Sequence, residues 1–164
     1  WLTLREPADH AARSRDLTAR VTHALVADAP VLVVDLGCGT GSNLRYLAPH
    51  LPVAQQWRLV DNDAALLAAA RTASPGRIET RLRDLAGIDS SLLAGAALVT
   101  SSALLDLVPD VWLARLVRLC ADARARVLMV LNYDGRIACT PVDDDDNADI
   151  DFVIAQSVIM WDHQ

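Results

Sequence analysis

The chain has 164 residues, of which 52% are hydrophobic and 4% aromatic, and its net charge is −6 at neutral pH. This length suits one domain with a single hydrophobic core. The negative charge disfavours nucleic acid as a partner, because a phosphate backbone is repelled unless basic residues gather locally, and the arginines here are scattered. The apolar stretches are too short to span a bilayer and no signal peptide is visible, so we expect a cytoplasmic protein with no membrane partner.

Hydrophobic patterns along the chain predict alternating helices and strands. The run VLVVD at 31–35 begins with four consecutive aliphatic residues, which is typical of a strand buried on both faces of a parallel sheet. In chain order the patterns predict a helix at 9–29, then strands at 31–35, 56–60, 77–82, 96–102 and 126–133 with helices at 41–48, 64–72 and 110–123 between them, and a last helix near 149–161. This alternation predicts an α/β fold with a doubly wound, mainly parallel sheet flanked by helices.

The segment DLGCGTGSNLRYL directly follows the first predicted strand. Gly37, Gly39 and Gly41 allow the main chain to turn sharply and to lie close to a ligand at the carboxyl end of the sheet. A dinucleotide-binding loop normally reads G-x-G-x-x-G, and Ser42 stands where its third glycine belongs. Asp35 would repel a pyrophosphate but attract a cation. The loop therefore suits a cationic nucleoside, such as S-adenosylmethionine, better than NAD.

Four segments together resemble a known family. VVDLGCGTGSNL resembles motif I of class I S-adenosylmethionine-dependent methyltransferases, which usually read hydrophobic-D/E-x-G-x-G-x-G. WRLVDND, RLRDLAG and LVTSSALLDLV are similar to the motifs after the second, third and fourth strands of that family, in the same order. The resemblance covers residues 30–135 and implies a Rossmann-like methyltransferase fold, with S-adenosylmethionine as cofactor and methyl transfer as activity.

The resemblance also implies which residues hold the cofactor. Asp61 would hold the ribose hydroxyls, and Asn62 would lie against the adenine. Asp84 would accept the adenine amino group, with the Leu85 main chain at the ring edge. The end of the fourth strand would line the pocket near the methionine and the methyl group. The predicted cofactor-binding residues are Asp35, Gly37, Cys38, Gly39, Gly41, Asp61, Asn62, Asp84, Leu85, Thr100 and Ser101.

The sequence does not identify the methyl acceptor or a catalytic base. Tyr133 and Asp134, after the fifth predicted strand, and Arg13, in the N-terminal helix, are candidates for contact with the acceptor. TSSALL stands where methyltransferases acting on bases have N/D-P-P-F/Y, so we expect a small-molecule acceptor rather than a nucleobase. The oligomeric state stays open, with a homodimer among the options.

We expect one domain over 1–164, with an N-terminal helix or lid at 1–29, a cofactor-binding core at 30–135 and an acidic linker with a C-terminal helix at 136–164. The family core normally ends in an antiparallel strand hairpin, and only five strands are predicted here, so the presence of that hairpin stays open. Three other functions also stay open. One is a protein that binds S-adenosylmethionine without transferring its methyl group, and another is an NAD(P)-dependent oxidoreductase, which Ser42 and Asp35 disfavour. The third is a cofactor-binding half that needs a partner chain.

No metal site is predicted. The three cysteines stand far apart, and no CxxC or His/Cys ligand spacing occurs. In the acidic run, Asp143, Asp145 and Asn147 match part of a calcium-loop pattern, but Ala148 stands where that loop requires Gly and Ile154 where it requires Glu. We interpret the acidic run as a solvated linker.

Overall fold

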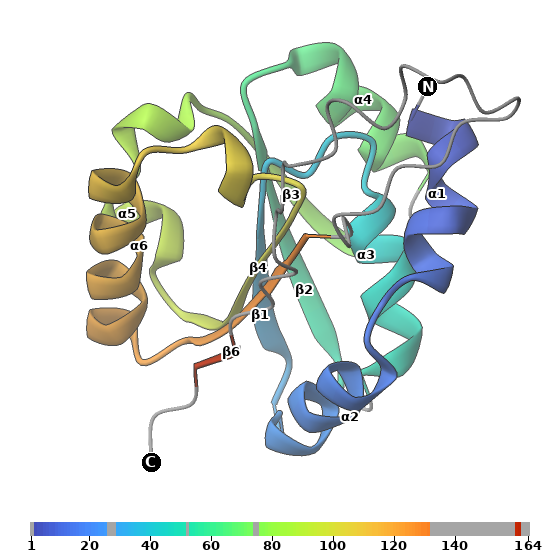
Figure 1. Cartoon of the computed structure of the whole chain (residues 1–164), viewed down its shortest axis with the longest axis horizontal. Helices are drawn as coiled ribbons and strands as arrows, with labels where there is room; N and C mark the ends of the chain where they lie inside the picture. The colour runs from blue at the N-terminus through green and yellow to red at the C-terminus, as the bar shows by residue number, and fades with distance from the viewer. Residues whose placement is uncertain (1, 26–28, 52, 74–75, 132–159, 162–164) are drawn as a thin grey trace, which may run out of the picture.

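The computed structural model describes residues 2–25, 29–51, 53–73, 76–131 and 160–161 (Figure 1). Its sheet has the strand order β3-β2-β1-β4-β5-β6. The strands are β1 Val31–Leu36, β2 Gln55–Asp61, β3 Arg77–Leu82, β4 Ala96–Ser102, β5 Arg126–Val130 and β6 Met160–Trp161. The helices are α1 Leu2–Ala11, α2 Arg15–Ala24, α3 Ser42–Leu47, α4 Ala64–Ala73, α5 Ser90–Leu93 and α6 Asp110–Ala123, with short 3-10 helices at Ala48–His50, Leu85–Gly87 and Leu105–Leu107.

The first five strands pair in parallel, and the order reverses at β1, which lies between β2 and β4. In β1, Val33, Val34 and Leu36 are completely buried, because helices cover both faces of the sheet. The predicted doubly wound α/β fold is therefore confirmed. The carboxyl ends of β1, β2 and β4 meet at one edge, where such sheets bind ligands.

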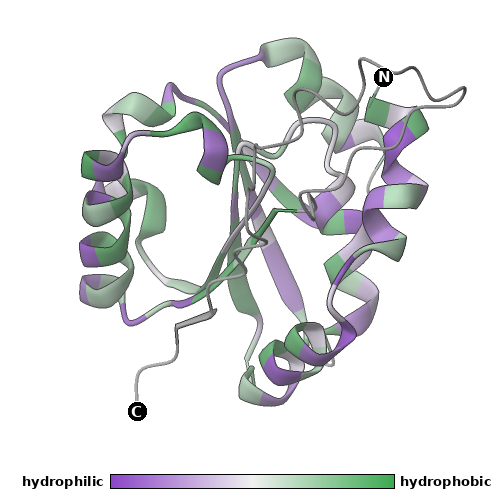
Figure 2. Cartoon of the chain, in the orientation of Figure 1, coloured by the Kyte–Doolittle hydropathy of each residue, from purple (hydrophilic) through white to green (hydrophobic). Residues whose placement is uncertain are grey.

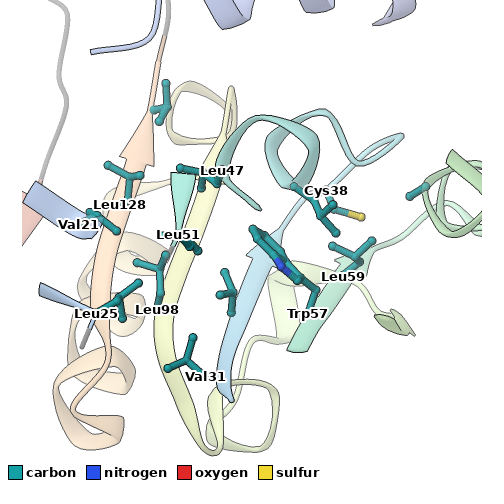
Figure 3. Packing of buried hydrophobic residues seen from close by; sticks show 14 of the residues in the cluster. Val21, Leu25, Val31, Cys38, Leu47, Leu51, Trp57, Leu59, Leu98 and Leu128 are labelled. Atoms are coloured by element: carbon teal, nitrogen blue, oxygen red, sulfur yellow. The ribbon is translucent and has the colours of Figure 1, made fainter. Parts of the chain in front are cut away.

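Two hydrophobic layers lie on opposite faces of the sheet. One contains Trp57 and Leu59 of β2 together with buried residues of α2, α3 and α4 (Figure 3). The other contains Val60 of β2 and Val99 of β4 with buried residues of α5 and α6. Neighbouring residues of one strand thus enter different layers, as the pleat of a strand requires. Hydrophobic residues accordingly dominate the central strands, whereas the helices carry both hydrophobic and hydrophilic sides (Figure 2).

The N-terminal region differs from the prediction of one helix over 9–29. The structure has two helices, α1 and α2, separated at residues 12–14. Ser14 explains the break: its side chain accepts a hydrogen bond from the Leu17 main chain at 3.3 Å, which caps the start of α2. Only α2 turns an apolar residue, Val21, into the core, whereas no residue of α1 is buried.

The C-terminal prediction of a helix near 149–161 is wrong for Met160–Trp161, which form β6 antiparallel to β5. The pairing satisfies main-chain groups that the edge of β5 would otherwise expose. Residues 149–159 lie outside the described residues, as do Tyr133 and Asp134. The fifth strand ends at Val130, earlier than predicted. Across the described ranges, none of the helices is both long enough and apolar enough to cross a membrane.

Candidate cofactor site

The glycine loop turns at the carboxyl end of β1 through three left-handed residues. Gly37, Gly39 and Gly41 have φ values of 65°, 52° and 81°, a region in which a side chain is strained. The main-chain N–H groups of Gly37 and Cys38 both donate to the Val60 carbonyl, at 2.9 and 3.1 Å. These bonds fix the loop against the end of β2, so the positive φ values are required by the path of the chain.

Asp61 joins the end of β2 to the same loop. Its carboxylate is buried and accepts a hydrogen bond from the Gly39 main chain at 2.8 Å on one oxygen and from Asp63 at 3.1 Å on the other. A carboxylate oxygen has lone pairs for more than one donor. Each oxygen of Asp61 thus keeps the capacity to accept a ligand hydroxyl, while the carboxylate itself is held in position.

A cavity of about 450 Å³ opens beside this carboxylate. Five of the predicted cofactor-binding residues line it: Gly37, Asp61, Asn62, Asp84 and Leu85. The opposite wall comes from the segment after β4 and from the start of α6, namely Ala103, Leu104, Leu107, Val108, Pro109 and Trp112, with Ala86 beside Leu85. The cavity therefore has carboxylates on one side and apolar side chains on the other.

Trp112 also belongs to the cavity wall, although none of the four sequence motifs includes it. Its ring nitrogen donates to the Leu85 carbonyl at 2.5 Å, which ties the first turn of α6 to the segment after β3. Fold topology could have indicated Trp112, because the N-terminus of a helix that follows a parallel strand lies at the ligand-binding edge of the sheet. Asp84 caps the short helix Leu85–Gly87 through a hydrogen bond from Ala86 at 2.8 Å.

Of the six other predicted residues, Cys38, Gly39 and Gly41 belong to the loop but do not line the cavity, and Asp35, Thr100 and Ser101 are buried beneath it. Asp35 is completely buried, and its Oδ1 accepts a hydrogen bond from Asn43 Nδ2 at 2.8 Å. The Thr100 hydroxyl donates to the Leu128 carbonyl at 2.8 Å, and the Ser101 hydroxyl donates to the Leu36 carbonyl at 2.6 Å. Both hydroxyls thus link neighbouring strands, and neither residue lines the cavity.

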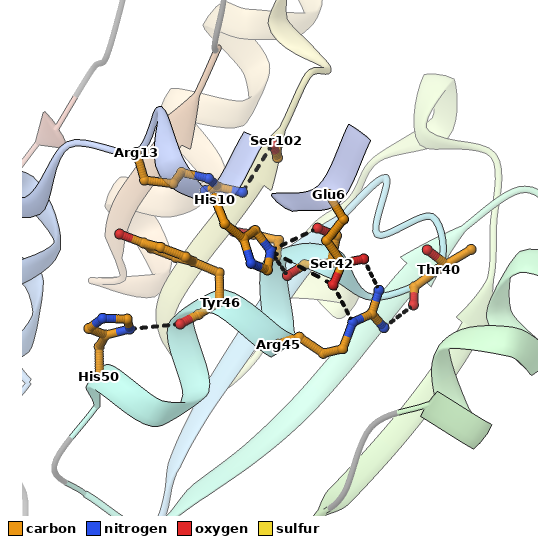
Figure 4. A network of polar contacts seen from close by, with 10 residues as sticks. Glu6, His10, Arg13, Thr40, Ser42, Arg45, Tyr46, His50 and Ser102 are labelled. Carbon is orange, nitrogen blue, oxygen red and sulfur yellow. Dashed lines mark hydrogen bonds and ion pairs between the residues drawn. The ribbon is translucent and has the colours of Figure 1, made fainter. Parts of the chain in front are cut away.

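Arg13 lies in the same buried network rather than on an open lid. Its guanidinium donates to Asn43 Oδ1 at 3.0 Å and to the Ser102 hydroxyl at 3.2 Å, and its Cζ lies 5.0 Å from the centre of the Tyr46 ring. Figure 4 shows the guanidinium directed to Ser102 across the start of α3. Asn43 bridges Arg13 and Asp35, and no sequence pattern indicated it. A buried amide between an acid and a base is visible only in three dimensions.

Helix α1 covers the glycine loop. Arg45 of α3 binds both Glu6 of α1 and the Thr40 carbonyl, the latter at 2.6 Å, and His10 Nε2 lies 3.1 Å from the Ser42 carbonyl (Figure 4). The Arg45 guanidinium holds the pKa of Glu6 below its usual value. Charged contacts therefore join the N-terminal segment to the glycine loop. The sequence predicted a helix or lid in this segment but none of these contacts.

Burial determines the protonation of two groups in this network. It raises the pKa of Asp35 to about 7, against the opposing effects of the Asn43 hydrogen bond and the Arg13 charge. It also raises the pKa of the Cys38 thiol, with Asp35 and Asp61 adding to the effect. Cys38 is thus a neutral, buried side chain and not a nucleophile. In the ranges that the structure describes, His, Cys, Asp and Glu side chains form no group that could hold a metal ion.

The free energy of unfolding should depend on pH through Asp35. The folded protein keeps the Asp35 proton up to about pH 7, whereas the unfolded chain, with the ordinary pKa of 3.8, has lost it. The folded state therefore binds more protons in between, and its stability should fall as pH rises from about 4 to 7. Urea unfolding at pH 5 and pH 7.5 measures this. Asp35→Asn should remove the fall, and an equal fall in that variant would contradict the assignment.

A family model for the methyltransferase domain matches residues 33–126, more than half of the chain. Two curated relatives are trans-aconitate 2-methyltransferases. The one from Acidovorax sp. (strain JS42) is 40% identical over 72 residues, covering 44% of this chain and 26% of that protein. The one from Acidovorax ebreus (strain TPSY) is 44% identical over 61 residues, covering 37% and 22%. The matched part thus spans about a quarter of the length of these relatives.

Solved structures agree on the fold. The plantazolicin methyltransferase BpumL in complex with SAH has a TM-score of 0.60 at 16% identity, covering 79% of this chain and 49% of that one. An S-adenosylmethionine-dependent methyltransferase from Mesorhizobium loti has a TM-score of 0.50 at 28% identity, covering 68% and 52%. The resemblance predicted from the four sequence motifs is confirmed, and the chain belongs to the methyltransferase domain family.

Proposed function

We propose that the protein transfers a methyl group from S-adenosylmethionine to a small-molecule acceptor. The observation that carries the proposal is the convergence of Gly37, Asp61, Asn62, Asp84 and Leu85 on one cavity at the carboxyl edge of the sheet. These residues come from three separate segments of the chain, and the family resemblance had implied each of them. If the glycine loop were only a turn in the fold, these five residues would not need to line one cavity.

The chemistry of the cavity fits an adenosine. The two oxygens of Asp61 are positioned to accept hydrogen bonds from the two ribose hydroxyls, and these would be charge-assisted bonds. Leu104 and Trp112 offer apolar contact to a flat base, and Asp84 offers an acceptor for an amino group. Gly37 leaves room for the ligand, because a Cβ there would lie 3.5 Å from Leu104, on the far wall of the same cavity.

The buried network beneath the loop fits the methionine end. Asp35 is an acid, and its Oδ2 has no hydrogen-bond partner. Arg13 is a base close enough to influence it. A methionine group carries an ammonium and a carboxylate, so we assign the ammonium to the side of Asp35 and the carboxylate to the side of Arg13. Glu6 and Arg45 would keep α1 over the loop and limit the access of water.

The residues of this chain would act by alignment. Bound S-adenosylmethionine would supply an activated methyl group on a sulfonium, and the leaving group is a neutral thioether. The protein has to place the acceptor atom in line with that methyl group, and such positioning can supply about 7–11 kcal/mol. None of the described residues is assigned as a base. Tyr133 and Asp134 stay our candidates for contact with the acceptor.

A small organic acid is the acceptor class that we propose. The two curated relatives are named for trans-aconitate, a carboxylate substrate. A second cavity of about 530 Å³ lies between α2 and α3 and reaches Arg13. Its basic lining residues are His10, Arg13, Arg15 and His50, and none of its lining residues is acidic. In a chain of net charge −6, this local positive character favours an anion.

A binding titration followed by a turnover assay tests the proposed function. We expect S-adenosylhomocysteine to bind with measurable heat and NADH to give none. Methyl transfer from labelled S-adenosylmethionine should then occur with members of a panel of di- and tricarboxylates and not with matched neutral esters. Binding without transfer to any acceptor would support a non-catalytic binding protein instead. Tighter binding of NADH than of S-adenosylhomocysteine would overturn the cofactor assignment.

Arg13→Ala should weaken the binding of S-adenosylhomocysteine about tenfold, because a buried charged hydrogen bond contributes about 1.5 kcal/mol. Arg20→Ala is the matched control, since it removes the same charge from an exposed position of α2 that lines neither cavity. Calorimetry on both variants measures the difference. Equal affinities in the two variants would remove Arg13 from the cofactor site.

A further inference from the structure

Asp35 combines complete burial with incomplete hydrogen bonding. One carboxyl oxygen accepts from Asn43, and the other, Oδ2, is buried without any partner. A buried carboxylate with a single donor is costly, because most of its hydration is lost and little replaces it. A protonated carboxyl carries no net charge and avoids most of this cost. Burial with a single donor therefore favours the neutral form of Asp35.

The charged and titratable groups around Asp35 do not remove this preference. Arg13, just before α2, is the cation whose charge reaches Asp35, but its guanidinium bonds go to Asn43 and Ser102. Asp61, at the end of β2, opposes ionisation, and the Cys38 thiol of the glycine loop is neutral. Asp35 is thus influenced by one cation, Arg13, which does not bond to it directly, and by one anion, Asp61. Burial has the largest effect and favours the protonated carboxyl.

We propose that Asp35 is protonated before the cationic methyl donor binds and releases its proton on binding, so that Asp35 distinguishes the donor from the demethylated product. The inference rests on the proposed function. The donor brings a sulfonium and an ammonium, and the released proton passes to solvent. The product lacks the sulfonium charge, so it lowers the pKa of Asp35 less and leaves more of the carboxyl protonated.

The proton balance is measurable by calorimetry of the full chain in buffers with different heats of ionisation. Because the pKa of Asp35 is about 7, S-adenosylmethionine should release about half a proton per site at pH 7. S-adenosylhomocysteine should release clearly less. The affinity for the donor should also rise about tenfold from pH 6 to pH 8, with a smaller rise for the product.

Asp35→Asn is the diagnostic variant, because an asparagine can still accept from Asn43 but cannot ionise. It should lose the extra proton release with the donor and narrow the affinity ratio of donor to product. Asp63→Asn is the matched control. It removes the same charge from an exposed cap of α4 and should behave as wild type. If Asp35→Asn does not fold, the comparison of the two ligands on the wild-type protein still decides.

Equal proton release with the two ligands would overturn the inference, as would undiminished release in folded Asp35→Asn. In both cases binding heat is still observed, so the proposed function stands. Absence of heat with either ligand would overturn the proposed function itself, and the inference with it. The two failures are therefore distinguishable in one set of titrations.

Discussion

Asp61→Ala should lower the affinity for S-adenosylhomocysteine by about 30- to 150-fold, which corresponds to about 2–3 kcal/mol. The substitution removes the acceptor that we assign to both ribose hydroxyls. It also frees the Gly39 N–H, which the carboxylate holds at 2.8 Å, so the glycine loop would lose part of its preorganisation. Calorimetric titration of the purified variant measures the loss.

The control for Asp61→Ala is again Asp63→Asn, two residues further along the chain. Its side chain caps α4 and does not line the cavity, and an asparagine is also a good cap. We expect an unchanged affinity for S-adenosylhomocysteine in the control. If Asp61→Ala were to bind as tightly as the control while remaining folded, the ribose would have to lie elsewhere.

Gly37→Ala should weaken cofactor binding by about 1–3 kcal/mol, roughly 5- to 150-fold, because an added methyl group takes up space in a fitted site. The new Cβ would lie 3.5 Å from Leu104 and 3.9 Å from Leu85, both of which line the cavity. It would therefore occupy space that we assign to the ligand. Titration with S-adenosylhomocysteine measures the loss of affinity.

Gly95→Ala separates this steric effect from backbone strain. Gly95 also has a positive φ, 76°, and the nearest atom to its added Cβ is Leu32 Cδ2 at 4.0 Å, away from the cavity. Both variants should lose about 1–2 kcal/mol of unfolding free energy, measured by urea denaturation. Only Gly37→Ala should lose affinity. An equal loss of affinity in both variants would mean that destabilisation, and not the cavity, explains the result.

The sequence predicted the parallel core of the fold because its signals are local. Continuous aliphatic runs such as 31–34 are typical of buried parallel strands, and the glycines after that run permit the sharp turn that the loop makes. The N-terminal break was missed because a single cap, Ser14, ended one helix and began another inside an unbroken amphipathic pattern. Residues 160–161 were read as helix because their pairing with β5 is a long-range contact.

The site was predictable only where its residues occupy motif positions. Asp61, Asn62 and Asp84 follow strands whose ends must meet at one edge, so their convergence could be inferred. Asn43 and Trp112 could not be assigned in this way. Asn43 matters because it lies between Arg13 and Asp35, which are 22 positions apart in the sequence, and such a bridge has no sequence periodicity.

A crystal structure of the protein with S-adenosylhomocysteine tests the central claim most directly. The account predicts the adenosine in the cavity between Asp61 and Trp112, with both ribose hydroxyls within hydrogen-bond distance of the Asp61 carboxylate. It also predicts the methionine ammonium facing Asp35. Ligand density in the basic cavity between α2 and α3 instead, with Asp61 bound only to its own loop, would contradict the account.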